Sequence, residues 1–139
     1  MRNDLGIDGL GDLVELPLVA TLATYRLDGS VLLSPVWHEW RDGGFNVVIG
    51  SGDVKARHVE RDPRASIALY ESDLPYRGLE LRGKARLQAK GAFEAQRRIA
   101  IRYLGQEAGE AYAAEPSGTE VILRLEPGEL RTWDFADGV

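Results

Sequence analysis

The sequence has no cysteine and only two histidines, His38 and His58, among 139 residues. The lack of cysteine excludes a disulfide framework, a thiolate zinc site and a cysteine nucleophile. Neither histidine has a partner at metal-ligand spacing, so we predict no metal site and expect both to be structural. No Ser-His-Asp arrangement and no pair of carboxylates stands out, and we therefore predict no catalytic side chain.

Long apolar runs are also missing. No segment approaches the roughly 18 apolar residues of a membrane span, and the N-terminus, MRNDLGIDGLGDLVEL, has no positive region followed by an apolar core. A net charge of −5 argues against general nucleic-acid binding. These absences predict a cytoplasmic protein with no membrane span and no nucleic-acid partner.

What the chain does contain is a close succession of short β-rich segments. Asp28-Gly29 and Asp42-Gly43-Gly44 are hairpin signals between apolar runs, and residues 79–87 alternate apolar with charged side chains. The expected strands are 18–25, 31–41, 45–51, 64–71, 79–87, 119–125 and 130–135. The expected helices are 51–61 and 91–104, the second resuming through Tyr112, and residues 1–16 are expected to form a short frayed helix or an arm. Six to seven antiparallel strands with two or more helices predict a mainly β (α+β) fold, a small barrel formed by one domain over residues 1–139.

The segment from Ser51 to Arg57 joins an expected strand to an expected helix, with Ser51 or Asp53 as its N-cap. Unpaired N–H groups in the first turn of a helix favour an anion. Lys55 and Arg57 oppose the helix dipole there, and a phosphate would remove that conflict. Two solvated charges on a surface helix are an equally good explanation.

Pro35 interrupts an expected strand, in the run Leu33-Ser34-Pro35-Val36-Trp37. Proline cannot donate to a ladder, so it indicates an edge, a bulge or a place where another group meets the backbone. A planar ring packed near Trp37 would be such a group, and an edge strand with a core tryptophan is the alternative. Tyr76-Arg77 offers an aromatic face and a cation, or a plain turn.

Several motifs in order carry a family resemblance: Lys55 to Ile67 (KARHVERDPRASI), Ala20 to Thr24, the Asp-Gly hairpin, Ser-Pro-Val-Trp at Ser34 to Trp37, and Gly83-Lys84-Ala85. The chain resembles the pyridoxamine-phosphate-oxidase-like FMN-binding split β-barrel superfamily over nearly its whole length. Within it, the chain is most similar to the actinobacterial branch that uses the deazaflavin coenzyme F-420. Branches that use FMN share the scaffold, so FMN is the alternative cofactor.

The resemblance implies a homodimer with the cofactor in the groove between subunits. Its binding residues would be Lys55 and Arg57 on the phosphate with help from Ser51, the backbone of Ser34, Pro35, Val36 and Trp37 along the ring, and Tyr76 and Arg77 from the partner chain. His58 stands where many members have asparagine. The chain ends soon after Trp133 without the longer Arg-x-Glu-x-Trp segment, so pyridoxamine phosphate oxidase activity is not expected.

The function that this resemblance implies is an F-420-dependent oxidoreductase. It would transfer hydride from the reduced cofactor to a small conjugated electrophilic acceptor, with no indispensable acid or base, because the cofactor carries the redox chemistry. Three alternatives remain open: an FMN-dependent oxidase or reductase, a non-catalytic cofactor-binding protein, and a haem-degrading split barrel, which needs an axial histidine.

Overall fold

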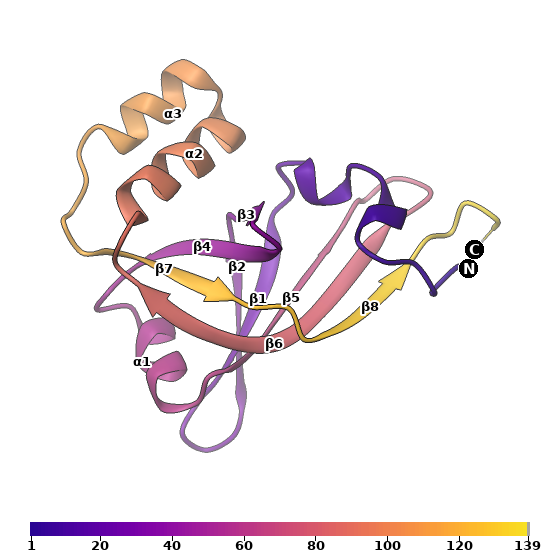
Figure 1. Ribbon diagram of the computed structural model, residues 1–139, viewed down its shortest axis with the longest axis horizontal. Helices are drawn as coiled ribbons and strands as arrows, with labels where there is room; N and C mark the ends of the chain where they lie inside the picture. Colours follow the sequence, from indigo (N-terminus) through magenta and orange to yellow (C-terminus); the bar gives the residue numbers. More distant parts are fainter. Residues whose placement is uncertain (139) are drawn as a thin grey trace.

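The computed structural model describes residues 1–138, and its strands form one strongly curved antiparallel sheet (Figure 1). The strand order is β2-β1-β5-β6-β7-β4-β3, and β8 pairs with β6. The strands are β1 (Ala20–Tyr25), β2 (Val31–Val36), β3 (Glu39–Arg41), β4 (Gly44–Gly50), β5 (Arg64–Tyr70), β6 (Gly78–Gln88), β7 (Glu120–Leu125) and β8 (Glu129–Trp133). The predicted mainly β split barrel is confirmed, with eight strands instead of six or seven.

The long strand β6 holds the two halves of the sheet together. One edge of it pairs with β5, while its other edge pairs first with β8 and then with β7. Between β7 and β8 the chain passes directly over Gly83, where an added methyl group would lie 2.2 Å from the carbonyl oxygen of Glu126. The predicted alternation is confirmed: Leu79, Leu81 and Ala85 are buried, and the charged residues between them lie outside or part-buried.

The expected strand 31–41 is two strands in the structure. β2 is an edge strand that pairs only with β1, whereas β3 pairs with β4. The break falls at Trp37 and His38, where the backbone of His38 bonds to side chains instead of to a ladder: its N–H donates to the Tyr103 hydroxyl (3.1 Å), and its carbonyl accepts from Arg102. Hydrogen bonds to two side chains that are distant in the sequence therefore end a strand that the local sequence alone would continue.

The N-terminal segment is neither one frayed helix nor a free arm. It forms two 3₁₀ turns, Asp8–Leu10 and Leu13–Glu15, and Leu10 and Leu13 are completely buried in the main core. The guanidinium of Arg102 binds the carbonyls of Val14 (2.8 Å) and Leu16. Leu10 ends the first turn and Leu13 begins the second, with Gly11 at φ 65° between them.

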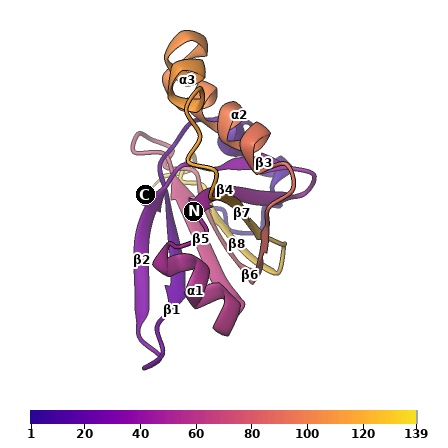
Figure 2. The same cartoon turned by 90° about the vertical axis from the view of Figure 1, so that its left-hand side faces the viewer.

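Three α-helices complete the fold: α1 (Val54–Arg61), α2 (Ala92–Leu104) and α3 (Gln106–Ala113). Figures 1 and 2 show the α2–α3 hairpin and α1 on opposite sides of β4 and β7. α2 ends at Gly105 with φ 90°, as the sequence predicts, and α3 packs closely on it because Gly109 has no side chain. Within residues 1–138, no helix combines the length and apolar character that crossing a bilayer requires.

Candidate functional site

A cavity of about 590 Å³ opens beside the end of β4, a size typical of small-molecule sites. The end of β2 and the adjoining residue contribute Pro35, Val36 and Trp37, and β4 contributes residues 47–50. The helical hairpin adds Gln96, Ile99 and Tyr112, and the start of α1 adds Asp53 and Lys55; Val19, Ser117 and Glu120 complete the lining. The cavity therefore forms only where the two halves of the sheet and all three helices meet.

Two aromatic residues, Trp37 and Tyr112, line this cavity, and Tyr103 packs behind Trp37. The ring of Trp37 stacks on Tyr103 with centroids 4.9 Å apart and planes within 8°, and Tyr112 lies 5.6 Å from Trp37 at 51°. The Tyr103 hydroxyl donates to the carbonyl of Leu18 (2.7 Å), which fixes the ring under Trp37. A planar ligand would meet an aromatic surface that is already ordered.

Behind this wall lies His38, which is fully buried. Its Nδ1 is 2.9 Å from the Tyr103 hydroxyl. That hydroxyl has one hydrogen and gives it to Leu18, so Nδ1 carries the imidazole proton. Within residues 1–138 the Nε2 atom has no hydrogen-bond partner. Burial, and then the charge of Arg102, lower the pKa of His38 to about 3, so the ring is neutral.

This buried histidine predicts a loss of stability in mild acid. The unfolded chain takes up a proton at His38 below about pH 6.5, whereas the folded chain does not until about pH 3. The contribution of His38 to the free energy of unfolding is therefore complete above about pH 6.5. Below that pH it decreases as the pH falls, by about 2 kcal/mol between pH 7 and pH 5. Urea unfolding at both pH values measures it. His38→Gln should remove most of this pH dependence, leaving the smaller part due to His58; a variant that keeps all of it would contradict the assignment.

The charged part of the cavity is the pair Lys55–Asp53. Asp53 is the N-cap of α1: its Oδ1 accepts the Lys55 N–H at 2.8 Å and lies 3.1 Å from Lys55 Nζ. Burial raises the pKa of Asp53, but the hydrogen bonds from Lys55 outweigh it, so the pKa lies below its usual value. The first turn of α1 therefore already holds a carboxylate, which offsets the conflict of Lys55 and Arg57 with the dipole. The sequence offered Asp53 as a cap without showing this consequence.

The other residues predicted near the cavity flank it. Ser34 is buried in β2 and does not line it. Ser51 is exposed, and its N–H donates to the carbonyl of Thr119 (2.8 Å). Arg57 is exposed on α1, with Nη1 2.9 Å from the carbonyl of Gly52. The structure thus brings Pro35, Val36, Trp37 and Lys55 to one cavity, whereas Ser34, Ser51 and Arg57 do not line it.

Tyr76 and Arg77 do not line the cavity of their own chain. They lie between β5 and β6, where the guanidinium of Arg77 bonds to Glu71 (2.7 Å), the carbonyl of Leu10 (2.8 Å) and Asp12 (2.9 Å). The hydrogen bond to Glu71 raises the pKa of Arg77. The Arg77 side chain therefore anchors the N-terminal segment, while Tyr76 remains exposed.

Tyr103, Tyr112 and Gln96 are site residues that the sequence analysis missed. Gln96 lines the cavity, and its buried Oε1 accepts no hydrogen bond from any described residue. All three residues lie on α2 and α3, where tyrosine and glutamine are ordinary surface residues and carry no motif. An unpartnered amide oxygen, an aromatic wall and a cation together fit a planar ring with N–H groups and an anionic side chain.

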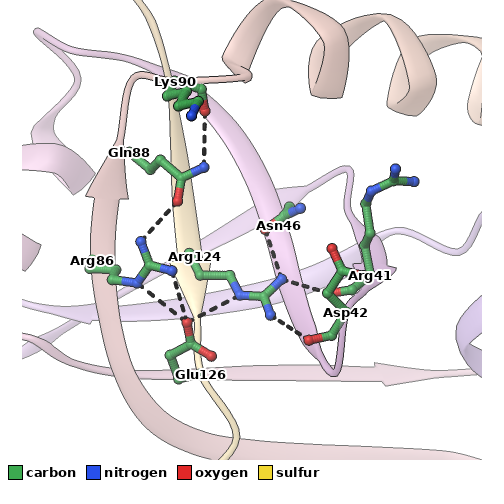
Figure 3. A network of polar contacts seen from close by, with 8 residues as sticks. All are labelled: Arg41, Asp42, Asn46, Arg86, Gln88, Lys90, Arg124 and Glu126. Carbon is green, nitrogen blue, oxygen red and sulfur yellow. Dashed lines mark hydrogen bonds and ion pairs between the residues drawn. The ribbon is translucent and has the colours of Figure 1, made fainter.

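A second polar hollow on the sheet is a structural network (Figure 3). Arg124 donates to the carbonyls of Arg41 (2.6 Å) and Asp42 (2.8 Å), and with Arg86 it contacts Glu126. These contacts tie the β3–β4 hairpin to β7. Glu126 contacts both arginines, but five cationic side chains and only two carboxylates line the hollow, so its lining is net positive.

Comparisons with known proteins agree with this architecture. The family model for pyridoxamine 5'-phosphate oxidase matches residues 10–134. A conserved hypothetical protein from Mycobacterium tuberculosis is similar at 26% identity and TM-score 0.80, over 95% of this chain and 86% of that one. A protein described as an F420 reductase is similar at 25% identity and TM-score 0.72, over 86% and 93% of the two chains. A FAD-binding protein from Mesorhizobium loti shares the fold at 16% identity and TM-score 0.69, over 94% and 95%. No curated protein matches the chain.

Proposed function

Since the chain belongs to the pyridoxamine 5'-phosphate oxidase family, we propose that it is an oxidoreductase that uses coenzyme F-420 to reduce a small conjugated acceptor. The observation that carries the proposal is the cavity, in which an ordered aromatic wall and a largely buried lysine face one space. The similarity to an F420 reductase over most of both chains supports a deazaflavin in preference to FMN.

In this proposal the cofactor supplies hydride transfer, and the chain supplies binding and orientation. The ring would lie along the backbone of Pro35, Val36 and Trp37, and Lys55 would hold the phosphate. The buried oxygen of Gln96 would accept a hydrogen bond from a ring N–H, because a buried acceptor without a partner costs free energy.

The carboxylates that line the cavity would not serve as the acid of the reaction. They are Asp53 and Glu120, and hydrogen bonds hold the pKa of each below its usual value, so both are ionised at neutral pH. An ionised carboxylate has no proton to donate. The proton that accompanies hydride transfer would then come from water.

An activity assay tests the proposal. Reduced F-420 is mixed with the protein and a quinone or an enone, and reoxidation of the cofactor is followed by its absorbance. We expect turnover of at least one acceptor that depends on the protein. Tight cofactor binding without turnover of any acceptor would favour the non-catalytic cofactor-binding protein.

We further propose that the active form is a homodimer. Along the edge strand β2 the exposed residues are apolar: Leu33 is 64% exposed, and Val31 and Pro35 lie on the same face. Val19, directly before β1, and Tyr70, at the end of β5, are 59% and 61% exposed. Such an apolar surface is typical of an interface, and it is continuous with the cavity at Pro35. Tyr76 and Arg77 would approach the cavity from the partner chain.

Leu33→Glu is expected to separate the dimer, because it places a charge within an apolar interface. Sedimentation at micromolar concentration should show a dimer for the unchanged protein and a monomer for the variant. Leu27→Glu is the control, since Leu27 is 83% exposed at the β1–β2 turn, outside this face. A monomeric unchanged protein would contradict the shared site.

A further inference from the structure

Asp53 is the feature of the cavity that the proposed function leaves unexplained. Its carboxylate lies on the cavity wall, directly beside the lysine that would bind the cofactor phosphate. A ligand anion that contacts Lys55 Nζ must therefore approach a fixed negative charge. A site intended only for tight anion binding would have a neutral cap at this position, because serine, threonine and asparagine also cap helices well.

The Asp53 carboxylate cannot readily move away from Lys55. Its Oδ1 accepts the backbone N–H of Lys55 at 2.8 Å, and Oδ2 lies 3.3 Å from Lys55 Nζ. Rotation of the side chain would uncap α1 as well as break the ion pair. Only 16% of the Lys55 side chain and 31% of the Asp53 side chain are exposed, so solvent screens the pair incompletely.

The charges around this end of the cavity balance. Lys55, Asp53 and Glu120 line it and supply one positive and two negative charges, and the exposed Arg57, which does not line the cavity but acts on Asp53, supplies a second positive charge. Glu120 is held by the N–H groups of Ser117 (2.6 Å) and Gly118 (3.0 Å). The remaining titratable group on this part of α1, His58, contacts the hydroxyl of Thr24 (3.0 Å) and is kept neutral near pH 7 by burial, which lowers its pKa. This end therefore has no surplus of two positive charges for a dianion.

We propose that Asp53 makes the phosphate site at Lys55 selective for a singly charged phosphodiester over a doubly charged phosphomonoester. The inference rests on the proposed function, because it concerns the anion of the same cofactor. The phosphodiester of F-420 carries one charge at this position, whereas the terminal phosphate of FMN carries up to two at neutral pH. Each additional negative charge on the ligand is repelled by Asp53, while the neutral part of the ligand is unaffected.

Three probes with the same ring separate the effect of charge from that of the cofactor ring: riboflavin, the methyl phosphodiester of FMN, and FMN. Their dissociation constants are measured by fluorescence quenching with the unchanged protein and with Asp53→Asn, which retains the cap but removes the charge. Glu60→Gln is the matched control, because it removes one charge from the same helix outside the cavity. Melting temperatures verify that each variant is folded.

The unchanged protein is expected to bind the phosphodiester more tightly than FMN. Asp53→Asn should strengthen FMN binding by about tenfold and phosphodiester binding by about threefold or less, the size of effect expected for partly screened charges. The dissociation constant of riboflavin should change less than about twofold in Asp53→Asn. In Glu60→Gln the dissociation constants of all three probes should change by less than this. If Asp53→Asn increased the affinity for FMN and for the phosphodiester equally, or increased neither, the proposed charge selectivity would be overturned. The proposed cofactor would not be affected by that result.

A second measurement needs no variant. The second proton of a phosphomonoester is lost near about pH 6, so FMN becomes largely a monoanion as the pH falls from 7.5 to 5.5. FMN should then bind the unchanged protein about fivefold more tightly at the lower pH, while the phosphodiester should not change. Parallel pH profiles for the two would overturn the inference. Failure of all three probes and of F-420 to bind at either pH would instead overturn the proposed function.

Discussion

Lys55→Ala is expected to weaken F-420 binding by about ten- to a hundredfold while leaving the fold intact. A hydrogen bond from a charged donor contributes roughly 1.5–3 kcal/mol, and 1.4 kcal/mol is a factor of ten in affinity. The Asp53 carboxylate would also lose its cation and would repel the cofactor anion. Isothermal titration measures the change, and the salt dependence of binding should become weaker because one contributing charge is lost.

The neighbouring cation provides an internal comparison for this result. Arg57 is exposed, bonds to the carbonyl of Gly52 and does not line the cavity, so Arg57→Ala should have a smaller effect than Lys55→Ala. Lys90→Ala, on the surface beside the second polar hollow, should change binding less than about twofold. Unchanged affinity in Lys55→Ala, with the melting temperature preserved, would remove the phosphate site from this helix.

Gly83→Ala should lower the free energy of unfolding by about 3 kcal/mol, near the upper end of the usual cost of overpacking. The new methyl group would lie 2.2 Å from the Glu126 carbonyl oxygen, which belongs to the backbone and cannot rotate aside. β6 and the β7–β8 connection would have to separate where the two halves of the sheet join. Urea unfolding measures the loss. Gly6→Ala, where an added methyl group meets nothing within 4 Å, is the control; equal stability of the two variants would contradict this packing.

Features that depend on neighbouring residues were predictable from the sequence. The Asp28-Gly29 hairpin, the alternation of 79–87 and the Gly105 helix end all follow from backbone geometry within a few residues, and the structure contains all three. The edge position of β2 follows from Pro35 in the same way. The helix start that carries Lys55 and Arg57 is also visible in the sequence, and α1 begins there at Val54.

Features that depend on contacts between distant residues were not predictable. The β2–β3 break is fixed by Tyr103 and Arg102, more than sixty residues away in the chain. Burial of the N-terminal leucines requires the same arginine, and the aromatic wall requires the α2–α3 hairpin to return over Trp37. The occupation of the helix start by Asp53 was visible as a possible cap, but its pairing with Lys55 depends on side-chain geometry that no spacing rule supplies.

Titration of the purified protein with F-420 and FMN side by side tests the proposed cofactor most directly. Quenching of Trp37, which lines the cavity, reports occupancy of the site, and Trp37→Phe identifies its share of the signal. We expect F-420 to bind at least about tenfold more tightly than FMN, with one site per chain. Equal or tighter binding of FMN would contradict the assignment of a deazaflavin to this cavity.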